Sequence, residues 1–307
     1  MDLFQLEIFL AVAEERSFSR AAARLHRTQP AVSQSIAKLE AELGETLLER
    51  ASRDGTLTDA GEVLQEYARK MLNLRTEAEA ALTDLRSLHT GRLSLAANEY
   101  TCLYLLSLLD EFRTRHPGIK ITVQRSLASR IADEVLQHSV ELGVLSFLPG
   151  DPQICSTAVY RDTLVCIVSP AHALARAGKT SIGRLGQETF IAHNVTSPMR
   201  EKVIAAFGRS RTPLKMDVEL PSLEAIKRFV ARGNGVALVP TLTVKQELRE
   251  GTLVAVEVPE LHLERKLRLV WRRRAALSHA AQSFIAVVEK YAVQHGPPFL
   301  FEAERGK

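Results

Sequence analysis

The sequence predicts a protein of overall α/β class, made of a mainly helical winged helix-turn-helix domain, a long helix and a larger two-lobed α/β domain. Apolar residues recur with helical spacing through residues 1–58, and residues 59–90 carry one continuous apolar stripe. From residue 91 on, short apolar runs typical of strands alternate with helical stretches. We therefore place domains at 1–58, 59–90 and 91–295. We place the lobes of the last at about 91–162 plus 266–295 and about 163–265, and a mobile tail at 296–307.

The composition fits a globular chain and gives no sign of a membrane span, a disulfide framework or a metal site. Hydrophobic residues make up 46% of the 307 residues, which is ample for buried cores. No apolar run approaches the roughly 18 residues of a membrane span, and the N-terminal segment lacks the features of a signal peptide. Three cysteines and nine scattered histidines show neither disulfide nor metal-ligand spacing. We expect a cytoplasmic protein without a metal.

The first two helices follow from apolar spacing and from capping residues. One buried face of the first helix is marked by Leu6, Phe9, Leu10 and Ala13. Either Ser17 or Ser19 caps a short alanine-rich second helix over residues 19–25. Three consecutive alanines in it allow close helix–helix approach, which a helix-turn-helix requires.

The third helix begins after a turn at His26 and Arg27, is capped by Thr28 and ends at Gly44. Its apolar stripe, expected to pack on the first two helices, is Val32, Ile36, Leu39 and Leu43. The opposite face carries slim or polar side chains: Pro30, Ser33, Gln34, Ala37 and Lys38. Such a face fits a major groove, where a glutamine pairs with adenine and an apolar group contacts a thymine methyl. An ordinary exposed helix face is the alternative, although such faces are usually rich in Glu and Lys.

The charge distribution supports contact with DNA phosphates. Residues 1–90 hold 11 Lys and Arg against 15 Asp and Glu, yet no acidic residue lies between Arg16 and Lys38. A local basic face matters for phosphates because the field decays within about 10 Å. A hairpin is predicted over residues 45–58, with a turn that is flanked by two arginines. The candidate DNA-binding residues are Arg27, Thr28, Gln29, Pro30, Ser33, Gln34, Lys38, Arg50 and Arg53.

A long helix is predicted from residue 59 to residue 89. Its apolar stripe runs over about 30 residues and would extend about 45 Å, too far to be buried by one small domain. We expect it to pair with the same helix of a second subunit and so to space two recognition helices. Packing within its own chain is the alternative.

These residues resemble the N-terminal domain of the LysR-type transcriptional regulators. The run LEIFLAVAEERSFSRAAARLHRTQPAVSQSIAKLEAELGETLLER…LTDAG matches without a gap from Leu6 to Gly61. The chain departs from the family at Leu48, where phenylalanine is usual, and at Asp54, where glycine often follows the arginine. Both departures lie in the wing, so they bear on wing contacts and not on the recognition helix.

The C-terminal part is an alternation of strands and helices, which argues for parallel sheets. Strands are predicted at 92–97, 119–123, 140–147, 164–169, 215–219 and 235–239, and helices at 101–116, 129–137, 198–207, 222–232 and 278–293. This layout is similar to the effector domain of LysR-type regulators, which itself resembles periplasmic binding proteins. The resemblance implies that the chain crosses between lobes near residues 162–163 and returns near residues 265–266.

Ligands of such sheets bind beyond the carboxyl ends of the strands, where helix N-termini point at them. Hydroxyl and amide side chains at three predicted helix starts make a candidate site for a small anion or carboxylate: Asn98, Thr101, Ser129, Thr196 and Ser197. Simple helix caps are the alternative for these residues. Glu99 opposes an anion unless it points away. The cysteines are interpreted as small, half-buried hydrophobic residues, and a thiol of lowered pKa at Cys102, near a helix start, is the alternative. The basic run 265–274 is interpreted as a solvated edge.

The resemblance implies a regulator whose operator binding responds to a small-molecule co-inducer, with double-stranded DNA as partner. It further implies a homodimer formed through the long helix, assembling into a homotetramer, and contact with RNA polymerase if the protein is an activator. Two other classes stay open from the residues alone. An enzyme on the α/β domain lacks a nucleophile elbow, a dinucleotide fingerprint and an acid–base constellation. A solute-binding protein is opposed by the N-terminal domain.

Overall fold

The computed structural model describes residues 1–49, 56–86, 91–274 and 276–304. The chain divides into two compact units. Unit 1 is Met1–Leu88 with Gln137–Ser139, and unit 2 is His89–Leu136 with Val140–Lys307. Within the described ranges, no helix is long and apolar enough to cross a membrane.

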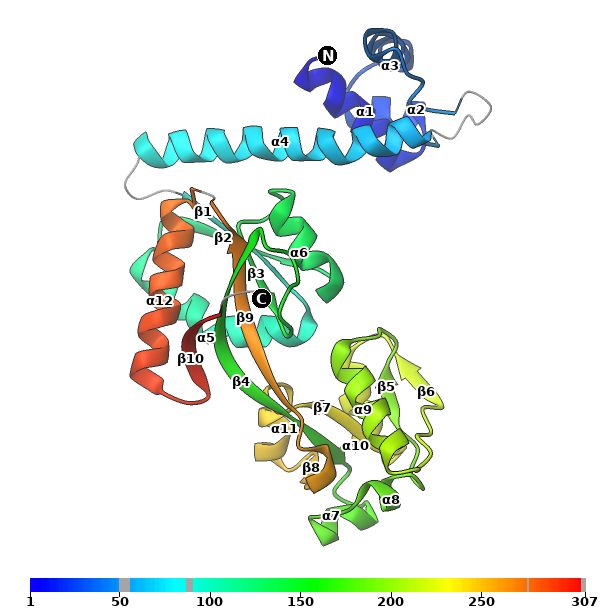
Figure 1. Ribbon diagram of the computed structural model, residues 1–307, viewed down its shortest axis with the longest axis vertical. Helices are drawn as coiled ribbons and strands as arrows, with labels where there is room; N and C mark the ends of the chain where they lie inside the picture. The colour runs from blue at the N-terminus through cyan, green and yellow to red at the C-terminus, as the bar shows by residue number, and fades with distance from the viewer. Residues whose placement is uncertain (50–55, 87–90, 275, 305–307) are drawn as a thin grey trace. The chain divides into compact units, whose positions relative to one another are not determined.

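Unit 1 contains α1 (Leu3–Glu15), α2 (Phe18–Arg24), α3 (Gln29–Leu43) and α4 (Asp59–Arg86) (Figure 1). Ser17, one of the two predicted caps, accepts a hydrogen bond from the backbone N–H of Arg20 and so starts α2. Thr28 occupies the N-cap of α3 without a side-chain hydrogen bond, and Pro30 lies in the first turn. Gly44 ends α3 with a φ of 74°, a left-handed conformation that favours glycine.

The core of unit 1 is formed where α1, α2 and α3 meet. Phe9, Val32 and Leu39 are completely buried, and Ile36 is 4% exposed. Leu43, predicted to belong to the same stripe, is instead 38% exposed. Leu43 is the last residue of α3, directly before Gly44. Side chains of the neighbouring helices therefore cover it less than they cover Val32, Ile36 and Leu39.

The segment after α3 is anchored by a carboxylate. Glu40 accepts hydrogen bonds from the N–H groups of Leu47 and Leu48, at 2.7 and 3.3 Å. Leu48 then forms an antiparallel bridge with Leu57, as expected for the base of the predicted hairpin. The turn of that hairpin, with the candidate residues Arg50 and Arg53, lies outside the described residues.

The start of α4 depends on a close backbone approach. The hydroxyl of Thr58 donates to the carbonyl of Thr46 and accepts from the N–H of Gly61. A Cβ at Gly61 would lie 2.1 Å from the carbonyl oxygen of Leu47, whose N–H is held by Glu40. Only glycine therefore lets α4 pack against this segment.

We expect Gly61→Ala to destabilise unit 1 by about 1–3 kcal/mol, because backbone must shift to relieve the overlap. Thermal unfolding followed by circular dichroism at 222 nm measures the change as a lowered midpoint of the helical transition. Gly208→Ala is the matched control, since a Cβ there meets nothing within 4 Å inside a helix. Equal midpoints for the two variants would contradict the close approach.

The apolar stripe of α4 divides into two faces. Leu64 and Leu72 pack on the core of unit 1, and Ala68 is completely buried there. A second row is exposed, by 39–60%, at helical spacing: Val63, Tyr67, Met71 and Leu74. The alternative, packing of α4 on its own chain, therefore accounts for one face of the helix and leaves the other uncovered by described residues.

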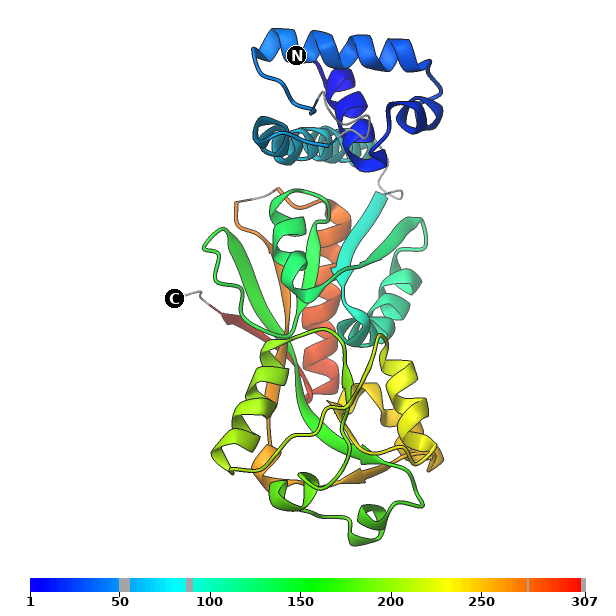
Figure 2. The same ribbon diagram turned by 90° about the vertical axis from the view of Figure 1, so that its right-hand side faces the viewer.

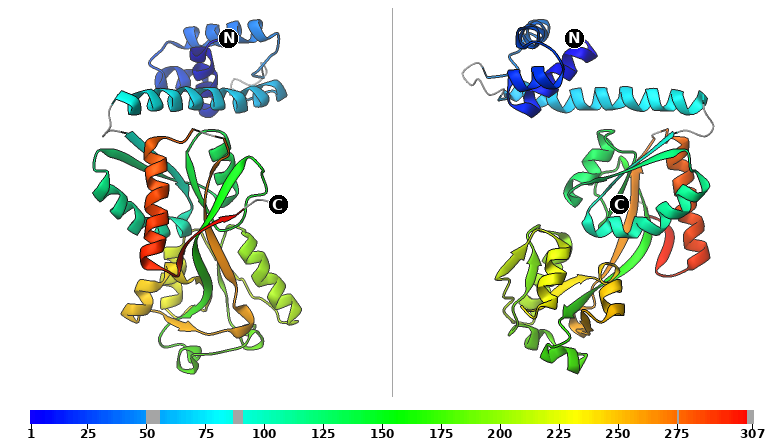
Figure 3. Two further views of the ribbon diagram at one scale, coloured as in Figure 1. Left: turned by 60° about the vertical axis from the view of Figure 1, so that its left-hand side comes forward. Right: turned by 180° about the vertical axis from the view of Figure 1, so that it is seen from behind.

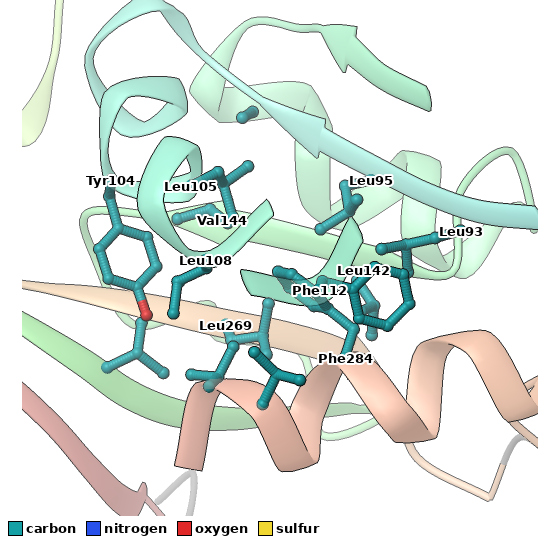
Figure 4. Close-up of a cluster of buried hydrophobic side chains, with 14 of the residues drawn as sticks. Leu93, Leu95, Tyr104, Leu105, Leu108, Phe112, Leu142, Val144, Leu269 and Phe284 are labelled. Carbon is teal, nitrogen blue, oxygen red and sulfur yellow. The ribbon is translucent and has the colours of Figure 1, made fainter. Parts of the chain in front are cut away.

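The first lobe of unit 2 is built on a mixed sheet. Its elements are β1 (Gly91–Ala97), α5 (Glu99–Arg115), β2 (Ile119–Arg125), α6 (Ala128–Leu136), β3 (Leu142–Leu145) and α12 (His279–His295), with the long strands β4 (Ile154–Val168) and β9 (Glu264–Arg272). The described strand order is β10-β4-β9-β3-β1-β2, in which β1 runs parallel to β2 and β3 and the other pairs are antiparallel. Leu93, Leu105, Leu142 and Phe284 meet in its core, between the sheet, α5 and α12 (Figure 4).

The second lobe is formed by the chain between the two long strands. It contains α7 (Ala173–Ala177), α8 (Ile182–Leu185), β5 (Ile191–His193), α9 (Pro198–Arg209), β6 (Val218–Leu220), α10 (Leu223–Ala231), β7 (Ala237–Pro240), α11 (Lys245–Glu250) and β8 (Val254–Val256). Short 3-10 turns cover Thr241–Thr243 and Pro259–Leu261. The second half of β4 pairs with β7 and β8, so β4 runs through both lobes, with β9 beside it (Figures 1 and 2).

The predicted mobile tail at 296–307 is wrong over most of its length. Residues Phe299–Glu304 form β10, which pairs antiparallel with β4 at the edge of the sheet (Figure 3). The ring of Phe299 lies 5.1 Å from that of Tyr160 and 4.8 Å from that of Tyr291. Because the partly buried ring of Phe299 packs against these aromatic residues, the chain stays ordered beyond α12.

Candidate nucleic-acid interface and ligand cavity

The structure brings the described DNA-binding candidates together at the start and along one face of α3. Ser33 is half-buried and the remaining six are exposed: Arg27, Thr28, Gln29, Pro30, Gln34 and Lys38. The opposite side of α3 is the buried face formed by Val32, Ile36 and Leu39. Figure 2 shows α3 side-on along the edge of unit 1. The exposed face thus presents an amide, a hydroxyl and a proline, with no acidic side chain before Glu40.

The basic face around α3 is narrower than its sequence indicates. Arg24 forms ion pairs with Glu14 and Glu15, at 2.9 and 3.3 Å, and Arg20 lies 3.8 Å from Glu15. These two arginines are therefore partly neutralised within unit 1. Lys38 lies 4.0 Å from Glu42 but keeps 69% of its side chain exposed.

Arg27, just before the start of α3, forms no ion pair with a described residue. Its guanidinium carbon lies 5.3 Å from the centroid of the Phe4 ring, a cation–π distance. Both side chains are exposed, so the contact orients the guanidinium without burying it. Arg27 and Lys38 therefore lie at the two ends of the exposed face of α3.

Unit 2 contains a cavity of about 740 Å³ between its two lobes. The first lobe contributes the carboxyl ends of β1, β2 and β3 with the starts of α5 and α6, and the second contributes β5 and the start of α9. Four of the five predicted effector residues line it: Asn98, Ser129, Thr196 and Ser197.

Thr101, the fifth predicted effector residue, does not line the cavity. It is completely buried, and its hydroxyl accepts from the N–H of Asn98 and contacts the carbonyl of Val144. Asn98 in turn accepts from the N–H groups of Tyr100 and Thr101, so the two residues form a reciprocal capping box. The helix therefore begins at Glu99, two residues before the predicted start. Asn98 is its N-cap, and Thr101 completes the capping box instead of lining the cavity.

Ser129, Thr196 and Ser197 combine hydroxyl groups with helix N-termini. Ser129 is exposed in the first turn of α6, and Thr196 is exposed just before α9. Ser197 caps α9 by accepting from the N–H of Arg200 at 3.2 Å. The first N–H groups of a helix lack helical acceptors and attract negative charge, so both walls of the cavity suit an anion.

Sequence reasoning missed Arg125. It ends β2, lies in register with Ala97 of β1 and lines the cavity with an exposed side chain. No residue in the described ranges forms an ion pair with it. Hydroxyl groups at helix starts do not indicate Arg125, because it is the last residue of strand β2. The end of this strand lies at the same edge of the sheet as those helix starts.

Arg265 also lines the cavity, and its interpretation as part of a solvated basic edge is wrong. Its guanidinium donates two hydrogen bonds to Oδ2 of Asp162, at 3.0 and 2.9 Å. The exposed fractions of the two side chains are only 6% and 3%. Oδ1 of Asp162 accepts from the N–H of Leu242, and the pair sits in register where β4 and β9 pass between the lobes.

Glu99 does not point away from the cavity but bridges the two lobes. Its Oε1 accepts from the N–H of Leu223, the first residue of α10, at 2.9 Å. Its Oε2 is buried, has no hydrogen-bond partner among described atoms and lies 3.6 Å from Nε2 of His193. Nδ1 of His193 accepts from the N–H of Val195 at 3.1 Å, which directs Nε2 toward the carboxylate. Burial raises the pKa of the neighbouring Tyr100 phenol, so this ring is neutral.

The cysteines give no support for a reactive thiol. Burial raises the pKa of the Cys102 thiol, opposite to the lowered pKa suggested by its place at a helix start. Burial likewise raises the pKa of Cys166 to about 12. Among the described residues, no group of three or more His, Cys, Asp and Glu is arranged to hold a metal ion.

A helix-turn-helix unit joined to a two-lobed unit with a cavity between its lobes defines a ligand-responsive DNA-binding regulator. Residues 3–62 match the family described as "Bacterial regulatory helix-turn-helix protein, lysR family", and residues 86–292 match the "LysR substrate binding domain". The chain therefore belongs to the LysR family of bacterial transcriptional regulators, which confirms the resemblance drawn from the sequence.

Known relatives and structures agree over nearly the whole chain. The chain is 31% identical over 284 residues to the RuBisCO operon transcriptional regulator of Allochromatium vinosum, covering 92% of this chain and 94% of that protein. It shares its fold with CbnR, a LysR family transcriptional regulator, with a TM-score of 0.75 at 22% identity, covering 95% and 99% of the two chains. The regulatory domain of Synechocystis CcmR, solved in complex with 2-PG, matches at 25% identity with a TM-score of 0.61, covering 67% of this chain and 98% of that one.

Proposed function

We propose that the exposed face of α3 reads operator DNA, with Gln34 and Ser33 contacting base edges in the major groove. Arg27, Thr28, Gln29 and Lys38 then contact phosphates at the two ends of the helix. This assignment rests on one observation: the exposed face of α3 has small or polar side chains and no acidic residue before Glu40, and it lies opposite the buried face of the helix. We also propose that Arg50 and Arg53 contact DNA from the wing, a proposal that rests on the sequence alone.

The cavity of unit 2 is proposed to bind a small anionic effector. Support comes from the hydroxyl groups of Ser129, Thr196 and Ser197, from two helix N-termini and from Arg125, all lining about 740 Å³. The regulatory domain of CcmR was solved with 2-PG, which is 2-phosphoglycolate, and this complex supports an anionic group on the ligand but not the chemistry of its second end. Among the described residues that line the cavity, no nucleophile is hydrogen-bonded to a base, so we propose binding without catalysis.

The assembly is proposed to be a homodimer through α4, with a homotetramer as the larger assembly. The exposed row Val63, Tyr67, Met71 and Leu74 supplies an apolar face of the length and spacing that helix pairing requires. The proposed domains are 1–58 for DNA, 59–90 for dimerisation and 91–295 for the effector. A regulator of this kind acts in the cytoplasm, where its operator lies, and contacts RNA polymerase if it is an activator.

Arg125→Gln tests the effector site. We expect the variant to weaken binding of a small phosphate or carboxylate about 10- to 100-fold, because a charge-assisted hydrogen bond is lost. The measurement is a thermal-shift screen of the full chain with inorganic phosphate, phosphate esters and carboxylates. A bound ligand stabilises by about 2.7 kcal/mol at a hundredfold excess over Kd.

The matched control is Arg130→Gln, which removes the same charge from an exposed residue of α6 that does not line the cavity. Arg130→Gln is expected to keep the wild-type thermal shift. Equal losses in both variants would show that overall charge, and not the cavity, binds the anion. A screen in which no anion shifts the wild-type chain would remove the effector proposal.

A further inference from the structure

The charges that line the cavity do not all attract an anion. Besides Glu99 and Arg125, the charged or titratable residues of the lining are Tyr100, His193, Arg200 and Arg265. Arg200 forms an ion pair with Glu219, and Arg265 is bound by Asp162. In the part of the chain that the structure describes, Arg125 is thus the one lining guanidinium without an ion pair. Glu99 is the one lining carboxylate, and no Lys or Arg pairs with it.

The carboxylate of Glu99 is held in the wall of the cavity. Its hydrogen bond to the N–H of Leu223 crosses from the first lobe to the second, and 27% of its side chain remains exposed. His193 approaches Oε2 only to 3.6 Å, beyond hydrogen-bonding distance. The backbone N–H of Leu223 therefore fixes the position of the carboxylate through Oε1. Oε2 is buried and has no hydrogen-bond donor among the described atoms.

Arg125 and Glu99 lie at the same edge of the sheet. Arg125 is in register with Ala97, two residues before Glu99, on the adjacent strand. Neighbouring strands are about 4.8 Å apart, and both residues line the same end of the cavity. No ion pair joins these two described side chains, so the lining holds one guanidinium and one carboxylate that do not neutralise each other.

We propose that Glu99 is the specificity-determining residue of this cavity, selecting a small ligand with one anionic end and a cationic or hydrogen-bond-donating second end. The anionic end binds at Arg125 and the first turn of α6, and the second end binds beside Glu99. A ligand that is anionic at both ends is rejected, because its second negative charge would lie beside the carboxylate of Glu99. This inference rests on the proposed anion-binding function and narrows its ligand class to zwitterions and hydroxylated monoanions.

Two probes of similar length separate the ligand classes. O-phosphoethanolamine and 2-phosphoglycolate both carry a phosphate ester, and they differ in ending with an ammonium or a carboxylate. Isothermal titration of the full wild-type chain is expected to give an affinity at least tenfold higher for O-phosphoethanolamine. Equal affinities, or a preference for 2-phosphoglycolate, would overturn the proposal without any variant.

Glu99→Gln tests the residue itself. Glutamine keeps an oxygen that accepts from Leu223 but removes the charge, so the ratio of the two affinities is expected to fall at least tenfold. Glu250→Gln is the matched control, since Glu250 is exposed on α11 and does not line the cavity, and it should keep the wild-type ratio. An unchanged ratio in Glu99→Gln overturns the role of Glu99. Absence of binding by both probes to both proteins overturns the proposed anion site, and this inference with it.

Discussion

Gln34→Ala is expected to weaken specific operator binding about 10- to 100-fold, which corresponds to about 1–3 kcal/mol. The physical reason is that a glutamine amide in the major groove makes two hydrogen bonds to one adenine, and alanine makes none. The exposed position of Gln34 opposite Val32 and Ile36 means that the substitution removes no packing. Fluorescence anisotropy on a DNA fragment selected by the wild-type chain from a random pool provides the measurement.

Two controls make this prediction specific. Gln246→Ala removes the same side chain from an exposed position of α11 and should leave operator affinity unchanged. Binding to a scrambled fragment should also stay the same in Gln34→Ala, because phosphate contacts are sequence-independent. Unaltered operator affinity in Gln34→Ala would remove this residue from base recognition.

Arg265→Met is expected to lower the free energy of unfolding of unit 2 by about 3–5 kcal/mol. The substitution leaves Asp162, whose side chain is 3% exposed, as a buried charge without its partner. Urea unfolding measures the loss through the fluorescence of Trp271, the single tryptophan of the chain, which lies on β9 in this unit.

The double variant Asp162→Leu with Arg265→Met should recover most of that loss, since no unpaired charge then remains. Part of it should persist, because Asp162 also accepts from the N–H of Leu242. Lys266→Met, on the same strand and paired with Glu302 at the surface, should shift the urea midpoint much less. If Arg265→Met and Lys266→Met behave alike, the buried pair does not stabilise the crossing between the lobes.

The features that sequence predicted well are those encoded over a few residues. Pro30 and Gly44 mark the two ends of α3 through their own backbone preferences, and the structure places the helix between them. The buried stripe from Val32 to Leu39 follows from helical periodicity alone. Leu43 departs from that stripe because its burial depends on how far the neighbouring helices extend, which spacing does not record.

The features that sequence missed depend on residues far apart in the chain. Arg265 looked like one member of a basic run until β4 brought Asp162 opposite to it, 103 positions earlier. Residues 299–304 looked like a tail because their partner strand, β4, lies well over a hundred residues earlier. The prediction for Thr101 failed for a local reason. Asn98 is the N-cap of α5, and Thr101 forms the other half of the capping box.

The lining of the cavity was predicted by position but not by charge. Hydroxyl residues at helix starts led correctly to Ser129, Thr196 and Ser197 as lining residues. Arg125 and Glu99 set the charge of the cavity only because the sheet and the second lobe bring them to one edge. Their joint effect on a ligand is a tertiary property that spacing along the chain does not express.

Ligand binding in unit 2 is expected to change how unit 1 binds operator DNA. The measurement is a footprint of the full chain on its selected operator, recorded with and without the anion found by the thermal-shift screen. We expect the ligand to change the footprint of the wild-type chain, and Arg125→Gln to bind the operator without such a change. A footprint that is identical with and without ligand, or a change that persists fully in Arg125→Gln, would show that the cavity does not control operator binding.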